Sequence, residues 1–194
     1  MSEKRGNLPI LLFAAKPAFE DWLAQQPEGT AGAWLRFAKN SAAIASLTKA
    51  EAIDAALCQG WIDGQLDKYN AESWLVRFTP RKARSKWSEV NRTRAEVLIA
   101  AGRMHPRGLT EVERAKADGR WAAAYAPAST ATVPEDLAAA LTANPKAQAF
   151  FATLTGANRY AVLYRIGAVK KLETRARKIA EFVTMLERGE AVHG

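Results

Sequence analysis

Apolar residues in the first part of the chain follow two different periods. Phe19, Trp22 and Leu23 are spaced at i, i+3 and i+4, which predicts a short helix within residues 17–27. The segment 32–39 partly alternates and carries Trp and Phe, a pattern that favours a strand. The chain is therefore expected to begin with both helical and extended structure.

The boundaries of the next helix are predicted by its end signals. Thr48 and Glu51 have the spacing of a capping box, in which each side chain satisfies a free backbone donor of the other residue. Gly60 is a typical C-terminal stop. Asp63 and Gly64 follow, and Asp-Gly favours a two-residue hairpin turn because both positions need positive φ. We therefore expect a helix followed by a hairpin.

The segment 73–79 alternates between large apolar residues and a mixed set, which predicts a half-buried strand. A basic stretch leads from it into a helix expected over residues 88–101. Thr110 and Glu113 repeat the capping-box spacing and predict the start of another helix, which would end at Gly119.

The last third of the chain has a helical pattern throughout. Pro134 and Pro145 are each expected at the first position of a helix, where proline is favoured. Two further helices are predicted by apolar spacing, one lined by Tyr160, Leu163, Tyr164 and Gly167, the other by Leu172, Ala176, Ile179, Val183 and Leu186.

These elements predict an α+β protein. The expected organisation is a mainly helical N-terminal domain with a small antiparallel β element over residues 1–126, followed by a small all-α C-terminal domain over residues 133–194. The small and polar segment 127–132 is expected to link the two domains.

Composition narrows the class of partner. The chain has 194 residues, of which 48% are hydrophobic, so it can build a core and is not globally disordered. A formal net charge of +8 favours acidic partners: an anionic small molecule, an acidic protein or nucleic acid.

Metal sites and disulfides are not expected. Cys58 is the single cysteine, and His105 and His193 are the only histidines, so we predict no metal and no cofactor. Pro9 interrupts the short apolar run near the N-terminus, which argues against a signal peptide, and no stretch approaches the roughly 20 apolar residues of a membrane span. A cytoplasmic protein without membrane insertion is expected.

The stretch 77–94 carries seven Arg and Lys residues against one Glu. Cations on a loop that leads into a helix N-terminus could bind an anion, helped by backbone donors and the helix dipole. The alternative is a solvated loop whose Trp packs on the core. The candidate anion-binding residues in this stretch are Arg77, Arg81, Lys82, Arg84, Lys86, Trp87 and Asn91.

Three other groups of polar residues carry weaker hypotheses. Asp63 and Gln65 could project into a pocket with the anion site, or Asp63 could merely satisfy turn geometry. Cys58 and His105 would be the only nucleophile and base pair of this kind, although a buried thiol and a loop histidine are the simpler reading. In the last helix, Lys171, Arg175 and Lys178 line one flank, which could be a basic face or an ordinary solvated surface.

Several long motifs resemble one bacterial family. The runs ALCQGWIDGQ (56–65), RFTPRKARSKWSEVN (77–91), AAGRMHPRG (100–108) and ADGRW (117–121) are similar to YdeI/OmpD-associated proteins, also called bacteriocin-protection proteins, and KKLETRARKIAEFVTMLERG (170–189) resembles their helical domain. The resemblance implies an α+β part followed by a helical part. It implies association with a porin and survival of bacteriocins or antimicrobial peptides, and it supplies no catalytic residue.

These observations predict a non-catalytic, cytoplasmic binding protein linked to stress or to bacteriocin protection, acting through its basic stretch. One alternative is an enzyme on a small anionic substrate, which requires Asp63 and Arg77 or Arg81 to line one pocket. A second alternative is a nucleic-acid-binding protein. The oligomeric state is not predicted.

Overall fold

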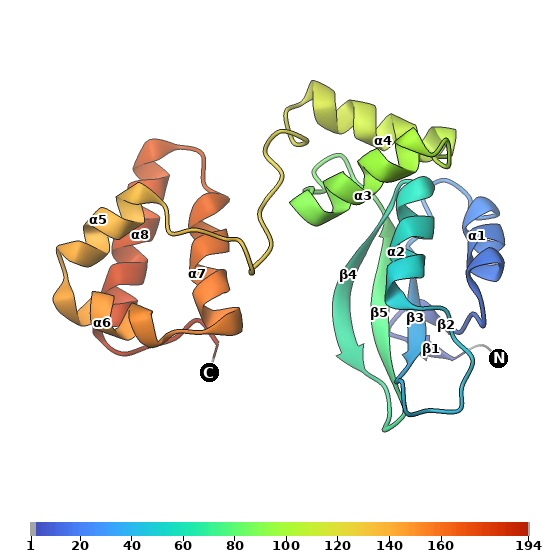
Figure 1. The fold of residues 1–194 in the computed structure, drawn as a ribbon, viewed down its shortest axis with the longest axis horizontal. Coiled ribbons are helices and arrows are strands. Elements are labelled where there is room, and N and C mark those ends of the chain that lie inside the picture. The colour runs from blue at the N-terminus through green and yellow to red at the C-terminus, as the bar shows by residue number, and fades with distance from the viewer. Residues whose placement is uncertain (1–2, 194) are drawn as a thin grey trace. The chain divides into compact units, whose positions relative to one another are not determined.

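A computed structural model describes residues 3–193, and its helices and strands are labelled in Figure 1. The chain forms two compact units, the first extending to Ala124 and the second beginning at Tyr125. The first unit contains all strands of the described residues, and the second contains only helices.

Within the described residues, the first unit holds a five-stranded sheet in the order β1-β2-β3-β5-β4. The β2–β3 pair is parallel and the other pairs are antiparallel. The strands are β1 (Lys4–Arg5), β2 (Leu8–Leu11), β3 (Ala33–Ala38), β4 (Trp61–Lys68) and β5 (Ser73–Pro80).

The predicted fold of the N-terminal part, mainly helical with a small antiparallel β element, is therefore wrong. The sheet is mixed and organises the whole first unit. β2 was not predicted from the sequence because this strand is only four residues long and contains Pro9, a residue type that argues against a strand. Pro9 is tolerated because its pair with Lys4 is a non-hydrogen-bonded one: the Ile10 N–H donates to the Glu3 carbonyl, so the ladder needs no donor from Pro9.

Four helices accompany the sheet in the described part of this unit: α1 (Lys16–Ala24), α2 (Lys49–Cys58), α3 (Glu89–Ala100) and α4 (Pro106–Ala117). The capping box at Thr48 and Glu51 is confirmed at the start of α2. The predicted helix start at the second capping box, Thr110 and Glu113, is wrong, because α4 begins earlier, with His105 as its N-cap. The Thr110 hydroxyl instead donates to the Pro106 carbonyl inside that helix.

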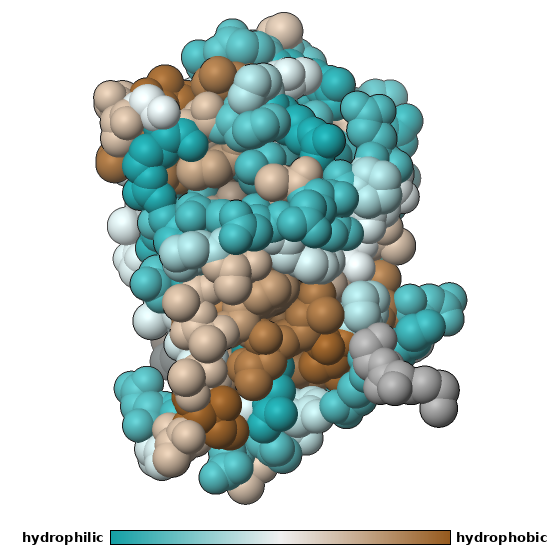
Figure 2. All heavy atoms as spheres, turned by 90° about the vertical axis from the view of Figure 1, so that its right-hand side faces the viewer, coloured by the Kyte–Doolittle hydropathy of each residue, from teal (hydrophilic) through white to brown (hydrophobic). Residues whose placement is uncertain are grey.

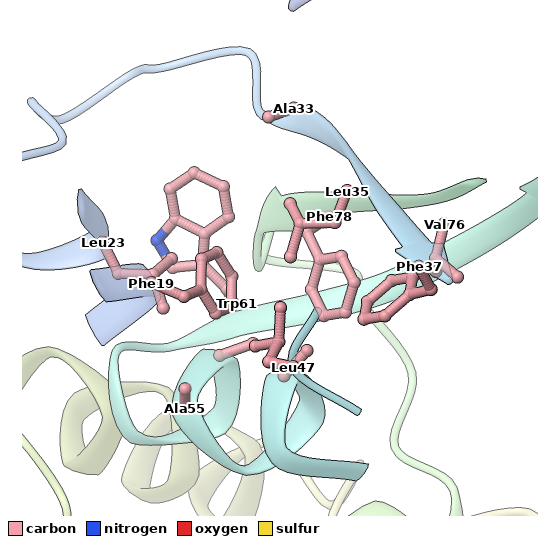
Figure 3. Close-up of a cluster of buried hydrophobic side chains, with 12 residues drawn as sticks. Phe19, Leu23, Ala33, Leu35, Phe37, Leu47, Ala55, Trp61, Val76 and Phe78 are labelled. Atoms are coloured by element: carbon pink, nitrogen blue, oxygen red, sulfur yellow. The ribbon is translucent and has the colours of Figure 1, made fainter. Parts of the chain in front are cut away.

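The main core lies between the sheet and the helices α1 and α2 (Figure 3). Phe19 and Leu23 of α1 are fully buried against Phe78 of β5, whose ring meets that of Phe19 edge-on at 5.8 Å. Trp61, at the start of β4, closes the cluster beneath α1 through an edge-on contact with Trp22. Burial of these aromatic side chains stabilises the unit.

The predicted hairpin turn at Asp63–Gly64 is also wrong, because both residues lie inside β4. The pairing register moves from Asp63 opposite Phe78 to Leu66 opposite Val76, so β4 has one extra residue at this point. This arrangement is a β-bulge, a feature that tolerates Gly without needing a chain reversal.

The sheet curls at its ends. Arg5 of β1 forms an ion pair of 2.6 Å with Asp67 of β4, although these strands stand at opposite ends of the strand order. The Tyr69 hydroxyl donates to Glu3 across the same face. A second, smaller cluster of Leu8, Trp34 and Leu75 is enclosed there, on the face opposite α1 and α2.

The second unit contains the helices α5 (Glu135–Thr142), α6 (Pro145–Thr153), α7 (Gly156–Gly167) and α8 (Leu172–Glu187). Its own core is built from all four of these helices. The apolar face predicted for α8 is confirmed at Ile179 and Leu186, which are buried. Leu172, predicted on the same face, is 84% exposed, and Phe182, which was not predicted there, is buried.

Arg175 joins three helices of the second unit. Its guanidinium is bonded to Asp136 of α5, with one contact at 2.9 Å, and donates to the Ile166 carbonyl near the end of α7 at 2.7 Å. These contacts lower the pKa of Asp136, chiefly because the guanidinium stabilises the ionised carboxylate.

Candidate functional site

The centre of the predicted anion site is the connection from β5 to α3, residues 81–88, here called the basic loop. Pro80 ends β5 and Ser88 caps α3 by accepting a hydrogen bond from the Asn91 N–H at 3.1 Å. The loop is therefore fixed at both ends by regular structure.

Arg81 lies inside the loop rather than on its surface. The side chain is only 6% exposed, and its guanidinium carbon lies 3.5 Å from the centre of the Trp87 ring. Its Nη1 donates to the Lys86 carbonyl at 3.1 Å, and its backbone N–H donates to the Gly60 carbonyl. A cation stacked and bonded in this way organises the loop.

Trp87 and Asn91 are also buried. The Trp87 ring packs edge-on against Trp121 at 4.8 Å, in a cluster with Leu57 and Leu98. The face of Trp87 that is covered by Arg81 is closed to a stacking base or aromatic ligand. Trp87 therefore has a packing role, which is the alternative considered for it from the sequence.

The tip of the basic loop is closed by hydrogen bonds. The Lys82 N–H donates to Ser85 Oγ, and the Ser85 N–H donates back to the Lys82 carbonyl, both at 2.8 Å. Arg120 donates to the Ser85 carbonyl at 2.7 Å and is held by Asp118 through two bonds from its Nε. Sequence reasoning missed Arg120 as a supporting residue, although the motif ADGRW contained it.

The exposed cations at this tip are Lys82 and Arg84, with Lys86 exposed beside them. Among the residues that the structure describes, no carboxylate oxygen lies within 4 Å of Lys82 or Arg84. A hydrogen-bonded loop thus presents positive charge to solvent at a fixed place, and such a surface attracts an anion.

The structure separates Asp63 from Arg77. Asp63 pairs with Phe78 in register, so it lies on the helix-covered face of the sheet, where Lys49 of α2 approaches its carboxylate at 3.5 Å. Arg77 is the next residue along β5 and therefore points to the other face. Gln65 is exposed in the β-bulge. Asp63 and Arg77 therefore point to opposite faces of the sheet and do not line one pocket.

Cys58 and His105 are placed by backbone packing. Cys58 is buried, and desolvation raises the pKa of its thiol, which keeps the sulfur protonated and unreactive. His105 Nδ1 accepts from the Arg107 N–H at 3.3 Å as the N-cap of α4. In the described part of the chain, no cluster of three or more His, Cys, Asp or Glu residues could hold a metal ion.

The basic flank of α8 is largely occupied within the second unit. Arg175 is paired with Asp136, and Lys178 Nζ lies 2.8 Å from Glu181. Lys171 is exposed at the N-cap position. Across residues 3–193, moreover, every helix is too short or too polar to cross a membrane.

An α+β unit with a supported basic loop, followed by a four-helix unit, defines a protein of two parts. Residues 11–111, more than half of the chain, match the model of a domain of unknown function, DUF8412, and the chain belongs to that family. Residues 130–189 match the model described as "Bacteriocin-protection, YdeI or OmpD-Associated", which confirms the resemblance predicted from the sequence for the helical unit. No curated protein and no solved structure matches the chain.

Proposed function

We propose that this protein contributes to protection against bacteriocins or antimicrobial peptides by binding an anionic ligand at the basic loop, in the cytoplasm and without catalysing a reaction. The match of residues 130–189 suggests the protection role through its family description. The anion-binding part of the proposal is supported by Lys82 and Arg84, which stand exposed on a loop closed by its own hydrogen bonds.

The rigidity of the basic loop favours a ligand site over a flexible arm. The buried Arg81–Trp87 stack and the Arg120 contact fix the backbone that carries the exposed cations. A preorganised cationic site loses less conformational entropy when an anion binds than a mobile segment does. This single arrangement carries the proposal.

Direct binding of a cationic toxic peptide is disfavoured by the positive net charge of this protein. Antimicrobial peptides of the amphipathic class are rich in Lys and Arg, and the chain itself carries a formal net charge of +8. Like charges oppose association, so an indirect route through an anionic molecule or an acidic protein surface is favoured.

The test is a calorimetric titration with inorganic tripolyphosphate as the anionic probe. The variant Lys82→Ala/Arg84→Ala should weaken binding by about tenfold, because two exposed cations contribute on the order of 1.4 kcal/mol together. The matched control is Lys170→Ala/Lys171→Ala, which removes the same charge from the second unit and should change affinity less than twofold.

Equal losses in the two variants would show that only net charge matters, and the basic loop would be discarded as the site. The same variants, expressed in bacteria challenged with a bacteriocin, connect binding to protection. Survival must fall with the loop variant and not with the control. A 20-nucleotide single-stranded DNA, tested in parallel, decides the nucleic-acid alternative through the salt dependence of its affinity.

A further inference from the structure

A second site lies away from the basic loop, under the connection from β3 to α2. Residues 39–48 cross the end of the sheet and leave an open pocket of about 700 Å³. A volume of that order suits a small organic molecule. The connection is anchored by the Leu47 N–H, which donates to the Phe13 carbonyl, and by the Ala38 N–H, which donates to Ser46 Oγ.

The wall of this pocket is aromatic and continuous with the core. Phe37 and Trp74 face each other across β3 and β5 at 5.1 Å, and both line the pocket. Leu47, which also lines it, points into the core beside Phe37 (Figure 3). Trp74 is only partly buried, so one part of its indole is open to a planar ligand. Apolar residues also gather on the side of the molecule seen in Figure 2.

The polar lining has one sign of charge. Lys39 and Lys49 line the pocket together with hydroxyl groups, and none of the described lining residues is acidic. The Lys39 ammonium is held at the rim by the Ala71 carbonyl at 2.7 Å. A cationic rim over an aromatic wall is complementary to a planar molecule that carries a carboxylate or similar anion.

Lys49 is partly engaged by a residue outside the pocket. Its ammonium lies 3.5 Å from the Asp63 carboxylate, which reaches it from β4. A ligand carboxylate at the pocket would compete with Asp63 for this cation. Asp63 is therefore expected to limit the affinity for an anion rather than to supply it.

We propose that the pocket between residues 39–48 and the Phe37–Trp74 wall binds a small aromatic carboxylate, with Lys39 and Lys49 neutralising its charge and Asp63 competing for Lys49. This inference is independent of the function proposed for the basic loop. In this proposal Asp63 competes with the ligand for Lys49, whereas from the sequence Asp63 was considered as a catalytic acid or base.

The experiment titrates the full-length protein with 2-naphthoate and with its neutral analogue 2-naphthylmethanol, by calorimetry. Wild type should bind the carboxylate saturably and the alcohol about tenfold more weakly, because the alcohol lacks the charge-assisted bonds to the lysines. Ala42→Trp, which places an indole in the pocket from its lining, should weaken binding of both compounds strongly. Asp63→Asn should tighten binding of 2-naphthoate by about two- to fivefold, because it releases Lys49.

The direction of the Asp63→Asn effect is decisive, since a general loss of folding could only weaken binding. Lys39→Gln supplies a second weakening variant if Ala42→Trp does not fold. The loop variant Lys82→Ala/Arg84→Ala should bind 2-naphthoate as wild type does. The proposal is overturned by the absence of saturable binding, by equal affinities for the two compounds, or by weaker binding in Asp63→Asn.

Discussion

Arg81 is the residue on which the geometry of the basic loop depends most. Its guanidinium is buried, stacks on Trp87 and donates to the Lys86 carbonyl. A guanidinium is weakly hydrated and planar, so it tolerates burial against an aromatic ring better than a lysine ammonium does. The loop is therefore assembled around an internal cation while other cations remain outside.

Replacement of Arg81 should cost stability rather than only affinity. We expect Arg81→Ala to lower the free energy of unfolding by about 2–4 kcal/mol, from the lost stacking and the unpaired carbonyl. Lys82→Ala, one residue further along, should stay within about 0.5 kcal/mol of wild type. Urea unfolding followed by circular dichroism measures both values. A change in Arg81→Ala as small as that in Lys82→Ala would contradict the organising role.

The difference between Arg81 and its neighbours could not be predicted from the sequence. Seven cations in one stretch look alike, and the Arg81 backbone N–H donates to the carbonyl of Gly60, which is 21 residues earlier. Trp121, which packs against Trp87, is also distant in the sequence. The clustering of charge could be recognised in the sequence, whereas the burial of Arg81 depends on contacts that form only in the folded protein.

At the scale of elements, α4 approaches the end of α2 closely at Gly108. A Cβ atom placed on Gly108 would lie 2.4 Å from the Cys58 carbonyl oxygen and 2.8 Å from that of Leu57. The His105 N–H also donates to the Cys58 carbonyl at 3.0 Å. Glycine at position 108 is therefore required by the distance between two backbones.

Gly108→Ala should destabilise the first unit by about 1–3 kcal/mol, because the two carbonyl oxygens belong to the backbone and cannot rotate away, unlike the Met104 methyl group that also lies at 2.8 Å. The matched control is Gly167→Ala at the end of α7. Apart from its chain neighbours and the backbone of its own helix, no atom of the described residues lies within 4 Å of an added Cβ, so that change should be neutral or stabilising by about 0.5 kcal/mol. Thermal unfolding of the two variants tests the contrast. A stable Gly108→Ala protein would mean that α2 and α4 can separate.

A capping motif predicted the start of a helix correctly only where no competing start signal stood just before it in the chain. The Thr48–Glu51 box is correct because both partners belong to the same turn. The equivalent pattern at Thr110 is overridden by His105 and Pro106, which start α4 one turn earlier. Asp63–Gly64 has the composition of a hairpin turn, yet pairing with β5 draws it into a strand. Strand pairing in the folded protein thus determined the structure of Asp63–Gly64, which the short motif did not predict.

At the scale of the whole molecule, each unit has its own hydrophobic core. Among residues 3–193, the core of the second unit is built from residues between Ala131 and Val192, and the clusters of the first unit are built from residues between Leu8 and Ala124. The two family models likewise match separate parts of the chain, residues 11–111 and residues 130–189. The helical character of the second part was readable from its apolar spacing, whereas the mixed sheet of the first part was not.

Each unit should therefore fold by itself. We expect fragments 1–124 and 125–194 to show cooperative urea unfolding and dispersed amide spectra, because each keeps its complete core. The predicted domain boundaries, with a linker at 127–132, are tested by the same fragments. A fragment that remains unfolded while the full chain is folded would show that its stability depends on the other part.

The β-bulge in β4 has a consequence for how the protein behaves in a crowded cell. β4 stands at the end of the strand order, and an edge strand offers free backbone groups to any other chain. The extra residue between Asp63 and Leu66 breaks the regular spacing of those groups just before Leu66, which is 57% exposed. A second strand cannot continue its hydrogen bonds across that irregularity, so the bulge protects this edge against pairing with another chain.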